Sequence, residues 1–179
     1  IRVTPGVEAH THEFIRTGQD DSKFGFTVST GAASQAVKRA QESSAMIFKG
    51  IHAHIGSQVF RSESYAEALE AIAGFASDRF EEISIGGGLG VAYVEGEEAT
   101  TITEWAETIR AAAERHQLHS NISVEPGRAI TAAAAVTLYT VGTIKDIPGI
   151  RTYVAVDGGM SDNPRPILYG SGYETFLPR

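Results

Sequence analysis

The chain has 179 residues, of which 42% are hydrophobic and 21% charged, the ordinary composition of a globular protein. Its formal net charge of −7 argues against a broad face for nucleic acid or a membrane surface, because such faces need an excess of Lys and Arg. Cysteine is absent, which excludes disulfides, thiolate metal sites and a cysteine nucleophile in this segment and fits the cytoplasm. No apolar run approaches the ~20 residues of a membrane span.

The first third of the chain alternates between strand and helix patterns. Residues 1–7 and 46–55 predict strands, and residues 8–22 predict a long polar loop. Between this loop and the second strand, small apolar side chains recur at helical spacing, at Ala33, Ala36, Val37 and Ala40.

Two capping boxes predict the starts of two further helices. They are Ser64-x-x-Glu67 and Thr101-x-x-Glu104. Behind each box an apolar stripe indicates the buried face of the helix, consisting of Tyr65, Leu69, Ile72 and Phe75 in the first helix and Trp105, Ile109 and Ala112 in the second.

Further strands are predicted at residues 82–85, 122–124 and 152–156, with a β-rich stretch at residues 133–144. Strand–helix–strand units repeated roughly every 30–40 residues favour parallel strands with helical crossovers. The pattern alone is compatible with an open doubly wound sheet or with a β/α barrel.

Polar residues that follow apolar strands favour the barrel. These residues are His54, Gly86, Glu125 and Asp157, and in a barrel the carboxyl ends of the strands share one rim, where active sites are built. A whole barrel takes ~250 residues, so we expect part of a TIM (β/α) barrel at residues 1–130. Residues 131–179 are expected to begin a β-rich C-terminal domain.

The first candidate motif is His52-Ala53-His54-Ile55-Gly56-Ser57. A side-chain period of two places both histidines on one face of a strand, where they could bind a metal, pack structurally or serve a site. No cysteine is present and no carboxylate follows nearby, so we expect no metal. Gly56 and Ser57 offer a backbone N–H and a hydroxyl suited to a phosphate.

The second motif is the glycine run Gly86-Gly87-Gly88. Consecutive glycine amides can converge on an anion, but a tight turn without a ligand is an equal alternative. The run is not a Walker loop, and Val91 stands where the dinucleotide-binding fingerprint requires Gly or Ala.

Two further motifs carry charge. In Glu125-Pro126-Gly127-Arg128 the carboxylate could pair with a protonated ring nitrogen and the guanidinium with a phosphate or carboxylate, or the two could pair with each other. Arg165 and Tyr169 lie four residues apart in a segment stiffened by prolines, whose alternative interpretation is an irregular surface loop.

Taken in order, these motifs resemble the fold-type III pyridoxal-phosphate decarboxylases, and most specifically the diaminopimelate decarboxylase family. The resemblance spans nearly the whole chain. Its signatures are Pro5-Gly-Val-Glu-Ala-His-Thr-His, Thr17-Gly18, Ser22-Lys-Phe-Gly25, His52-Ala-His-Ile-Gly-Ser-Gln58, Gly86-Gly-Gly-Leu-Gly90, Glu125-Pro-Gly-Arg128, Asp157-Gly-Gly-Met160 and Arg165-Pro-Ile-Leu-Tyr169.

The resemblance implies an alanine-racemase-like barrel that binds pyridoxal 5'-phosphate, with residue roles as follows. His54 would stack on the pyridine ring and Glu125 would pair with its nitrogen, which makes these two the catalytic candidates. The phosphate would be held by Ser57, Gly86, Gly87, Gly88, Gly127 and Arg128. The distal carboxylate of the substrate would be held by Arg128, Arg165 and Tyr169.

The implied activity is decarboxylation of meso-2,6-diaminopimelate to L-lysine and CO2, in a homodimer with shared active sites. An anionic substrate tail fits the two arginines, whereas the cationic tails of ornithine and arginine would be repelled. A related ornithine- or arginine-type decarboxylase and an inactive cofactor-binding homologue are the alternatives. The family's Schiff-base lysine and its Cys-Glu segment match no residue present, so we expect the segment alone to be inactive.

Overall fold

The computed structural model describes residues 1–7, 17–76 and 80–177. The chain divides into two compact units. Unit 1 consists of Ile1–Ala92 and Gly96–Ala133, and unit 2 of Tyr93–Glu95 and Ala134–Arg179. Each unit is described by itself.

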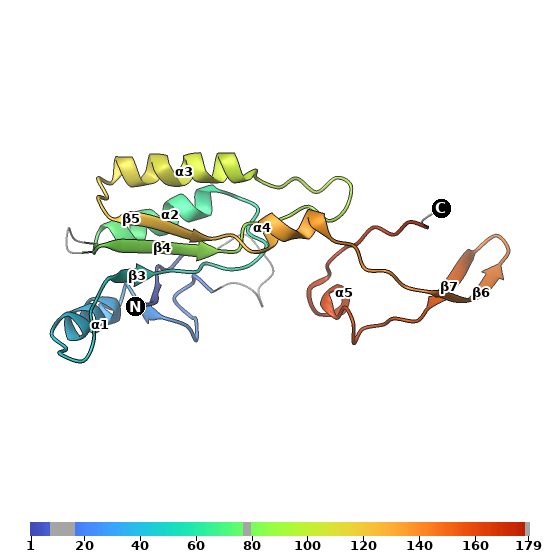
Figure 1. Cartoon of the computed structure of the whole chain (residues 1–179), viewed down its shortest axis with the longest axis horizontal. Helices are drawn as coiled ribbons and strands as arrows, with labels where there is room; N and C mark the ends of the chain where they lie inside the picture. The colour runs from blue at the N-terminus through green and yellow to red at the C-terminus, as the bar shows by residue number, and fades with distance from the viewer. Residues whose placement is uncertain (8–16, 77–79, 178–179) are drawn as a thin grey trace. The chain divides into compact units, whose positions relative to one another are not determined.

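Unit 1 is built on parallel strands (Figure 1). Its three-stranded sheet has the order β3-β4-β5, from β3 (Gly50–His52), β4 (Glu82–Gly87) and β5 (Asn121–Glu125). A second parallel pair joins β1 (Val3–Thr4) to β2 (Phe26–Thr27). A parallel bridge between Arg2 and His52 links this pair to the edge of β3.

Helices connect these strands as the crossovers of a β/α unit. They are α1 (Ala32–Gln41), α2 (Glu63–Ala73) and α3 (Ile102–Arg115), and α2 packs against both α3 and β4. The core between helices and sheet contains the fully buried Ile51, Ile83 and Ile85. The intervening residues His52 and Ser84 point to the opposite face of the sheet, because side chains alternate along a strand. Within the described ranges no helix is long and apolar enough to cross a membrane.

The predicted capping box of α3 is confirmed, and that of α2 is wrong. Thr101 accepts a hydrogen bond from the Glu104 amide, and the Glu104 side chain accepts one from the Thr101 amide. Helix α2 begins earlier than predicted, at Glu63, with Ser62 as its N-cap. Ser64 is therefore inside the first turn, where its side chain is buried.

The predicted apolar stripes are confirmed except at one end. Tyr65, Leu69 and Ile72 are fully buried in α2, as are Trp105, Ile109 and Ala112 in α3. Phe75 lies beyond the end of α2 and is only partly buried against the core. The predicted helix around Val37 is confirmed as α1, with Ala36 only half-buried.

The early strands are shorter than predicted. The strand expected at residues 1–7 is reduced to β1, and that at 46–55 to β3. Met46 and Ile47 are exposed, because the ladder with β4 begins only where Gly50 pairs with Glu82. Of the polar loop predicted at 8–22, residues 8–16 lie outside the described residues, and 17–22 form bends without a strand or helix.

Unit 1 ends in the short α4 (Arg128–Thr131), which runs into a 3-10 turn at Ala132–Ala134. The β-rich stretch predicted from residue 133 therefore starts late, at β6 (Val141–Ile147) in unit 2. Strand β6 pairs with β7 (Arg151–Val156), and α5 (Arg165–Tyr169) follows.

Strand β7 is antiparallel to β6. The expectation that Asp157 ends a parallel strand, like His54 and Glu125, is thus wrong. The physical reason is the connection, since a three-residue turn at 148–150 is far too short for the crossover that parallel strands need.

Candidate active site at the ends of the parallel strands

Three neighbouring strands of unit 1 each present a polar side chain on the face turned away from the helices. His52 of β3 is paired in register with Ser84 of β4, and Ser84 with Ser123 of β5. Glu125 is two residues beyond Ser123 and therefore shares its face. The strand register thus brings together residues that are about 30 to 40 positions apart in sequence.

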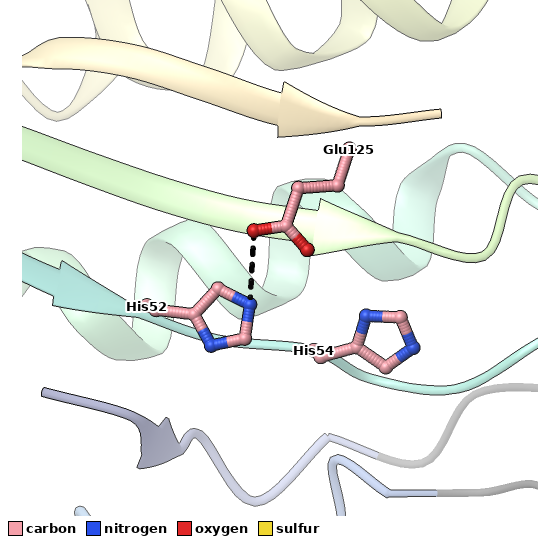
Figure 2. A group of neighbouring side chains, drawn as sticks. All are labelled: His52, His54 and Glu125. Atoms are coloured by element: carbon pink, nitrogen blue, oxygen red, sulfur yellow. Dashed lines mark ion pairs between the residues drawn. The ribbon is translucent and has the colours of Figure 1, made fainter. Parts of the chain in front are cut away.

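The Glu125 carboxylate is held through one of its oxygens. Ser84 Oγ donates a hydrogen bond to Glu125 Oε1 at 3.1 Å, and His52 Nε2 lies within ion-pair distance of the same oxygen, at 3.3 Å (Figure 2). The alternative that Glu125 pairs with Arg128 finds no support, because the described part of the chain shows no ion pair between them.

The His54 side chain is fixed by the backbone of the next strand. The Gly87 amide donates to His54 Nδ1 at 3.3 Å, so Nδ1 is the acceptor and the ring proton of the neutral imidazole is on Nε2. Burial lowers the pKa of His54, and the nearby charges of Arg2 and His52 lower it further, against an opposing effect of Glu125. His54 is therefore a neutral imidazole at neutral pH.

The motif residue Thr17 binds the backbone of His54. Its hydroxyl donates to the His54 carbonyl at 2.6 Å, while the Thr17 and Gly18 amides donate to the carbonyl of Ile55. The Thr17-Gly18 motif, which had no role in the sequence interpretation, thus anchors the backbone that carries His54.

Sequence reasoning missed Arg2 and Ser84. Arg2 Nη2 donates to the His54 carbonyl at 3.5 Å, and its positive charge acts on both His54 and Glu125. Arg2 could have been noticed as a site candidate because it is an isolated arginine in an apolar strand. No sequence signal marked Ser84, because its role depends on the register between β3, β4 and β5.

The glycine run is required by close packing. A Cβ at Gly87 would lie 2.0 Å from the carbonyl oxygen of Glu125, and one at Gly88 would lie 1.8 Å from that of Gly56. Tyr65 adds a buried hydrogen bond from its hydroxyl to the Gly87 carbonyl at 3.0 Å. Glycine is therefore needed where the end of β4 passes between β5 and the turn at Gly56.

The candidate phosphate residues are partly brought together. A Cβ on Gly88 would be 3.4 Å from Ser57 Cα, so the Ser57 backbone lies against the glycine run. The amides of Gly86 and Gly87 have internal acceptors, Ser84 Oγ and His54 Nδ1.

The Glu125-Pro126-Gly127-Arg128 segment continues from the end of β5, with Gly127 as the N-cap of α4. Arg128 Nη1 is buried and has no hydrogen-bond partner among the described residues. A buried guanidinium nitrogen without an acceptor fits an anionic ligand, because an unsatisfied charged donor is costly.

One argument against a metal is wrong. The sequence offered no carboxylate near the two histidines, but the fold supplies Glu125: ligand atoms of His52, His54 and Glu125 all lie within 4.8 Å of one another (Figure 2). The expectation that no metal binds stays a prediction.

In unit 2, Arg165 and Tyr169 lie on successive turns of α5. The guanidinium carbon of Arg165 is 5.4 Å from the centre of the Tyr169 ring, and Arg165 Nη2 donates to Ser171 Oγ at 3.4 Å. Arg165 Nε is buried without a hydrogen-bond partner in the described ranges. The segment is thus an ordered helix with a stacked arginine, and the alternative of an irregular loop is wrong at residues 165–169.

Residues 1–132 match the family described as "Pyridoxal-dependent decarboxylase, pyridoxal binding domain". The chain belongs to this family. The match covers all of the polar residues at the strand ends of unit 1, and it confirms the resemblance and the predicted cofactor class. The prediction that unit 1 is part of a β/α barrel is likewise confirmed by the solved structures of this family that the chain matches.

Among pyridoxal-dependent decarboxylases the chain is similar to diaminopimelate decarboxylases. It is 44% identical to that of Staphylococcus aureus (strain COL), over 99% of this chain and 44% of the relative. The Bacillus subtilis relative is 43% identical over 97% of this chain. The solved diaminopimelate decarboxylase of Helicobacter pylori complexed with L-lysine has a TM-score of 0.86 and 32% identity, covering 97% of this chain and 44% of that structure. The chain therefore spans less than half the length of these relatives.

Proposed function

We propose that the complete protein is a pyridoxal-phosphate-dependent decarboxylase that converts meso-2,6-diaminopimelate to L-lysine and CO2. The proposal is carried by His54 beside Glu125 at the strand ends and by the buried, unpartnered guanidinium nitrogen of Arg128, in a chain similar over nearly its whole length to diaminopimelate decarboxylases. The L-lysine bound to the Helicobacter pylori relative supports the proposed product.

The residues of unit 1 fit the ring of the cofactor. A carboxylate at the end of β5 is suited to pair with a protonated pyridine nitrogen, and we assign this role to Glu125. The lowered pKa of His54 keeps its imidazole neutral, so it can stack on the ring without placing a second positive charge beside the ring nitrogen. The bond from Gly87 to Nδ1 fixes the orientation of the imidazole.

The residues also fit the phosphate. Arg128 has a buried guanidinium nitrogen without an acceptor, which is the kind of donor that binds a phosphate oxygen. We assign the phosphate to Arg128 and Gly127 together with Ser57 and the glycine run Gly86, Gly87 and Gly88. Gly86 and Gly87 contribute mainly by shaping the turn, because their amides donate internally.

The bound cofactor supplies an electron sink for the electron pair left by the loss of CO2. The chain itself holds the cofactor and sets its charge. Glu125 keeps the proton on the ring nitrogen, and Arg128 balances the phosphate charge. Both roles orient the cofactor or stabilise its charge, and such roles require side chains that are fixed in position.

The substrate assignment rests on Arg128, Arg165 and Tyr169. Arg165 is stacked on Tyr169 and held by Ser171, so little rotamer freedom is lost when it binds a carboxylate. An arginine fork is suited to a carboxylate and repels an ammonium group. We therefore assign these residues to the distal carboxylate of diaminopimelate, and disfavour ornithine and arginine.

The organisation of the whole protein is part of the proposal. We assign residues 1–130 to a cofactor-binding barrel and 131–179 to the start of a C-terminal β domain. We further propose a cytoplasmic homodimer with shared active sites. The exposed apolar side chains of unit 2, such as Ile144 and Leu168, support a buried position for this unit in the assembled protein.

The test compares release of CO2 by the complete enzyme from meso-diaminopimelate, ornithine and arginine. The proposal expects clear preference for diaminopimelate, and a preference for ornithine or arginine would contradict it. No turnover of any of the three, with the cofactor bound, would indicate an inactive homologue.

A substitution pair sharpens this assay. Arg165→Ala should raise KM for diaminopimelate by roughly tenfold or more, the typical effect of losing a bond to a charged group. Arg151→Ala is the matched control, because Arg151 also lies over a tyrosine, Tyr153, at 5.8 Å but has no assigned role. Unchanged substrate preference in Arg165→Ala would remove the basis of the substrate assignment.

A further inference from the structure

The Glu125 side chain is restrained by polar contacts more than by packing. Its side chain is 55% exposed, and a glutamate side chain has several rotatable bonds that stay free at such a position. Both contacts that restrain it, from Ser84 Oγ and from His52 Nε2, converge on the single oxygen Oε1. In Figure 2 the other oxygen lies on the side of His54, outside the ion pair.

The two restraining residues are themselves fixed by the sheet. His52 ends β3, and its amide donates to the Ile1 carbonyl at 2.8 Å. Ser84 is buried within β4, where its hydroxyl also accepts the Gly86 amide at 3.3 Å. A rigid pair of strands therefore defines where Oε1 is, and the second oxygen is left for a ligand.

The geometry points to His52 and Ser84 as positioning residues for Glu125. They hold one carboxylate oxygen so that the other is presented to the cofactor's ring nitrogen. This inference rests on the proposed function, because it deepens the role that Glu125 has there. It gives His52 a task distinct from that of His54, although the two rings lie nearly parallel at 6.4 Å.

Loss of His52 removes one of the two contacts to Oε1 of Glu125. The Glu125 carboxylate then gains rotational freedom, and a carboxylate that is less well oriented makes a weaker contact to a protonated ring nitrogen. Ser84 donates a hydrogen bond to the same oxygen, so its loss should act in the same direction.

The experiment uses the complete enzyme with His52→Ala, His52→Gln and Ser84→Ala, and His119→Ala as a control for loss of an exposed histidine. The first readout is the affinity of the apo-form for pyridoxal 5'-phosphate. The second is the nitrogen-15 resonance of the labelled cofactor ring, which reports its protonation. We expect His52→Ala to weaken binding roughly tenfold and to move the resonance toward the neutral ring. We expect partial rescue by His52→Gln, an effect of Ser84→Ala in the same direction and no effect of His119→Ala.

A double-mutant cycle with Glu125→Gln separates positioning from a structural role. If His52 acts through Glu125, His52→Ala has little further effect in the Glu125→Gln background. An equal effect of His52→Ala in both backgrounds, or an unmoved ring-nitrogen resonance, overturns the inference and leaves the proposed function intact. Failure of the unsubstituted enzyme to bind the cofactor overturns the proposed function itself.

Discussion

The two units of the chain differ in how far they bury their apolar side chains. Unit 1 buries a continuous core between its helices and its parallel strands, with Trp105, Tyr65 and Leu69 almost completely inaccessible. The described residues of unit 2 include none that is buried, and Ile144 and Tyr153 of its hairpin are 60% and 52% exposed. The same chain therefore contains one unit with its own core and one without.

This difference indicates what each unit requires. Burial of apolar area is the main source of folding free energy, so unit 1 can be stable by itself. A hairpin without a packed face is marginal in water. Unit 2 should therefore depend for its stability on contacts outside its own hairpin.

The largest expected effect is the contrast between core substitutions. Leu69→Ala should destabilise unit 1 by about 3 kcal/mol, because it leaves a cavity in a buried site. Ile144→Ala in unit 2 should change stability by less than about 0.5 kcal/mol, as is usual for exposed positions. Urea unfolding of the 179-residue chain, followed by the fluorescence of Trp105, its only tryptophan, measures unit 1. Equal shifts for both variants would show that the two units unfold as one.

Amide hydrogen exchange should show the same difference in stability between the strands of unit 1 and those of unit 2. Amides in the middle of β4, which pairs on both sides, should exchange on the order of 100-fold more slowly than those of β6 and β7. Two-dimensional NMR of the 179-residue chain gives both rates in one experiment. Comparable protection in β6 and β4 would mean that unit 2 has a core of its own.

A smaller effect is expected at the start of α3. Thr101→Ala removes the acceptor for the Glu104 amide and should cost about 1 kcal/mol. Thr103→Ala, in the first turn of the same helix, is the matched control and should be neutral or slightly stabilising, because alanine is the better helix former. A thermal melt compares them, and an equal loss in both variants would argue against the cap.

The smallest effect concerns pH. Hydrogen bonds from the Thr101 amide and hydroxyl lower the pKa of Glu104 in unit 1, and those from Thr140 lower the pKa of Asp157 in unit 2. A lowered pKa stabilises the fold above the ordinary pKa of the group, and this contribution is lost as the pH falls through the lowered value. Carboxylate titration by NMR should find both groups below their ordinary range. Of the two groups, only Glu104 lies in unit 1, so only its protonation should lower the stability of unit 1. Asp157→Asn should therefore leave the pH midpoint of acid unfolding of unit 1 unchanged.

Much of unit 1 could be predicted because local signals agree with the tertiary structure. The stripe of α3 and its cap lie within one helix, and Gly86 to Gly88 and Glu125 are marked by the apolar strands before them. The convergence of His52, Ser84 and Glu125 on one oxygen could not be predicted. It depends on the register between three strands, which the sequence of any one strand does not specify.

The errors also have physical causes. Ser64 has the spacing of a capping residue, but tertiary packing buries it one residue inside α2. Asp157 follows an apolar strand as Glu125 does, but the short turn before β7 makes that strand antiparallel. Strand patterns alone do not distinguish the two directions; the length of the connection does. The roles assigned to the site residues stay predictions.

The most direct test of the account asks whether Arg128 holds the phosphate of the cofactor. The experiment measures the affinity of the apo-form of the complete protein for two ligands, pyridoxal 5'-phosphate and pyridoxal, which lacks the phosphate. It compares the unsubstituted protein with Arg128→Ala and with Arg110→Ala, a control at an exposed arginine. The account predicts that Arg128→Ala weakens binding of the phosphorylated cofactor by roughly tenfold or more and leaves pyridoxal binding and the Arg110→Ala variant unchanged. Equal loss for both ligands, or no loss for either, would contradict the assignment of the cofactor's phosphate to Arg128.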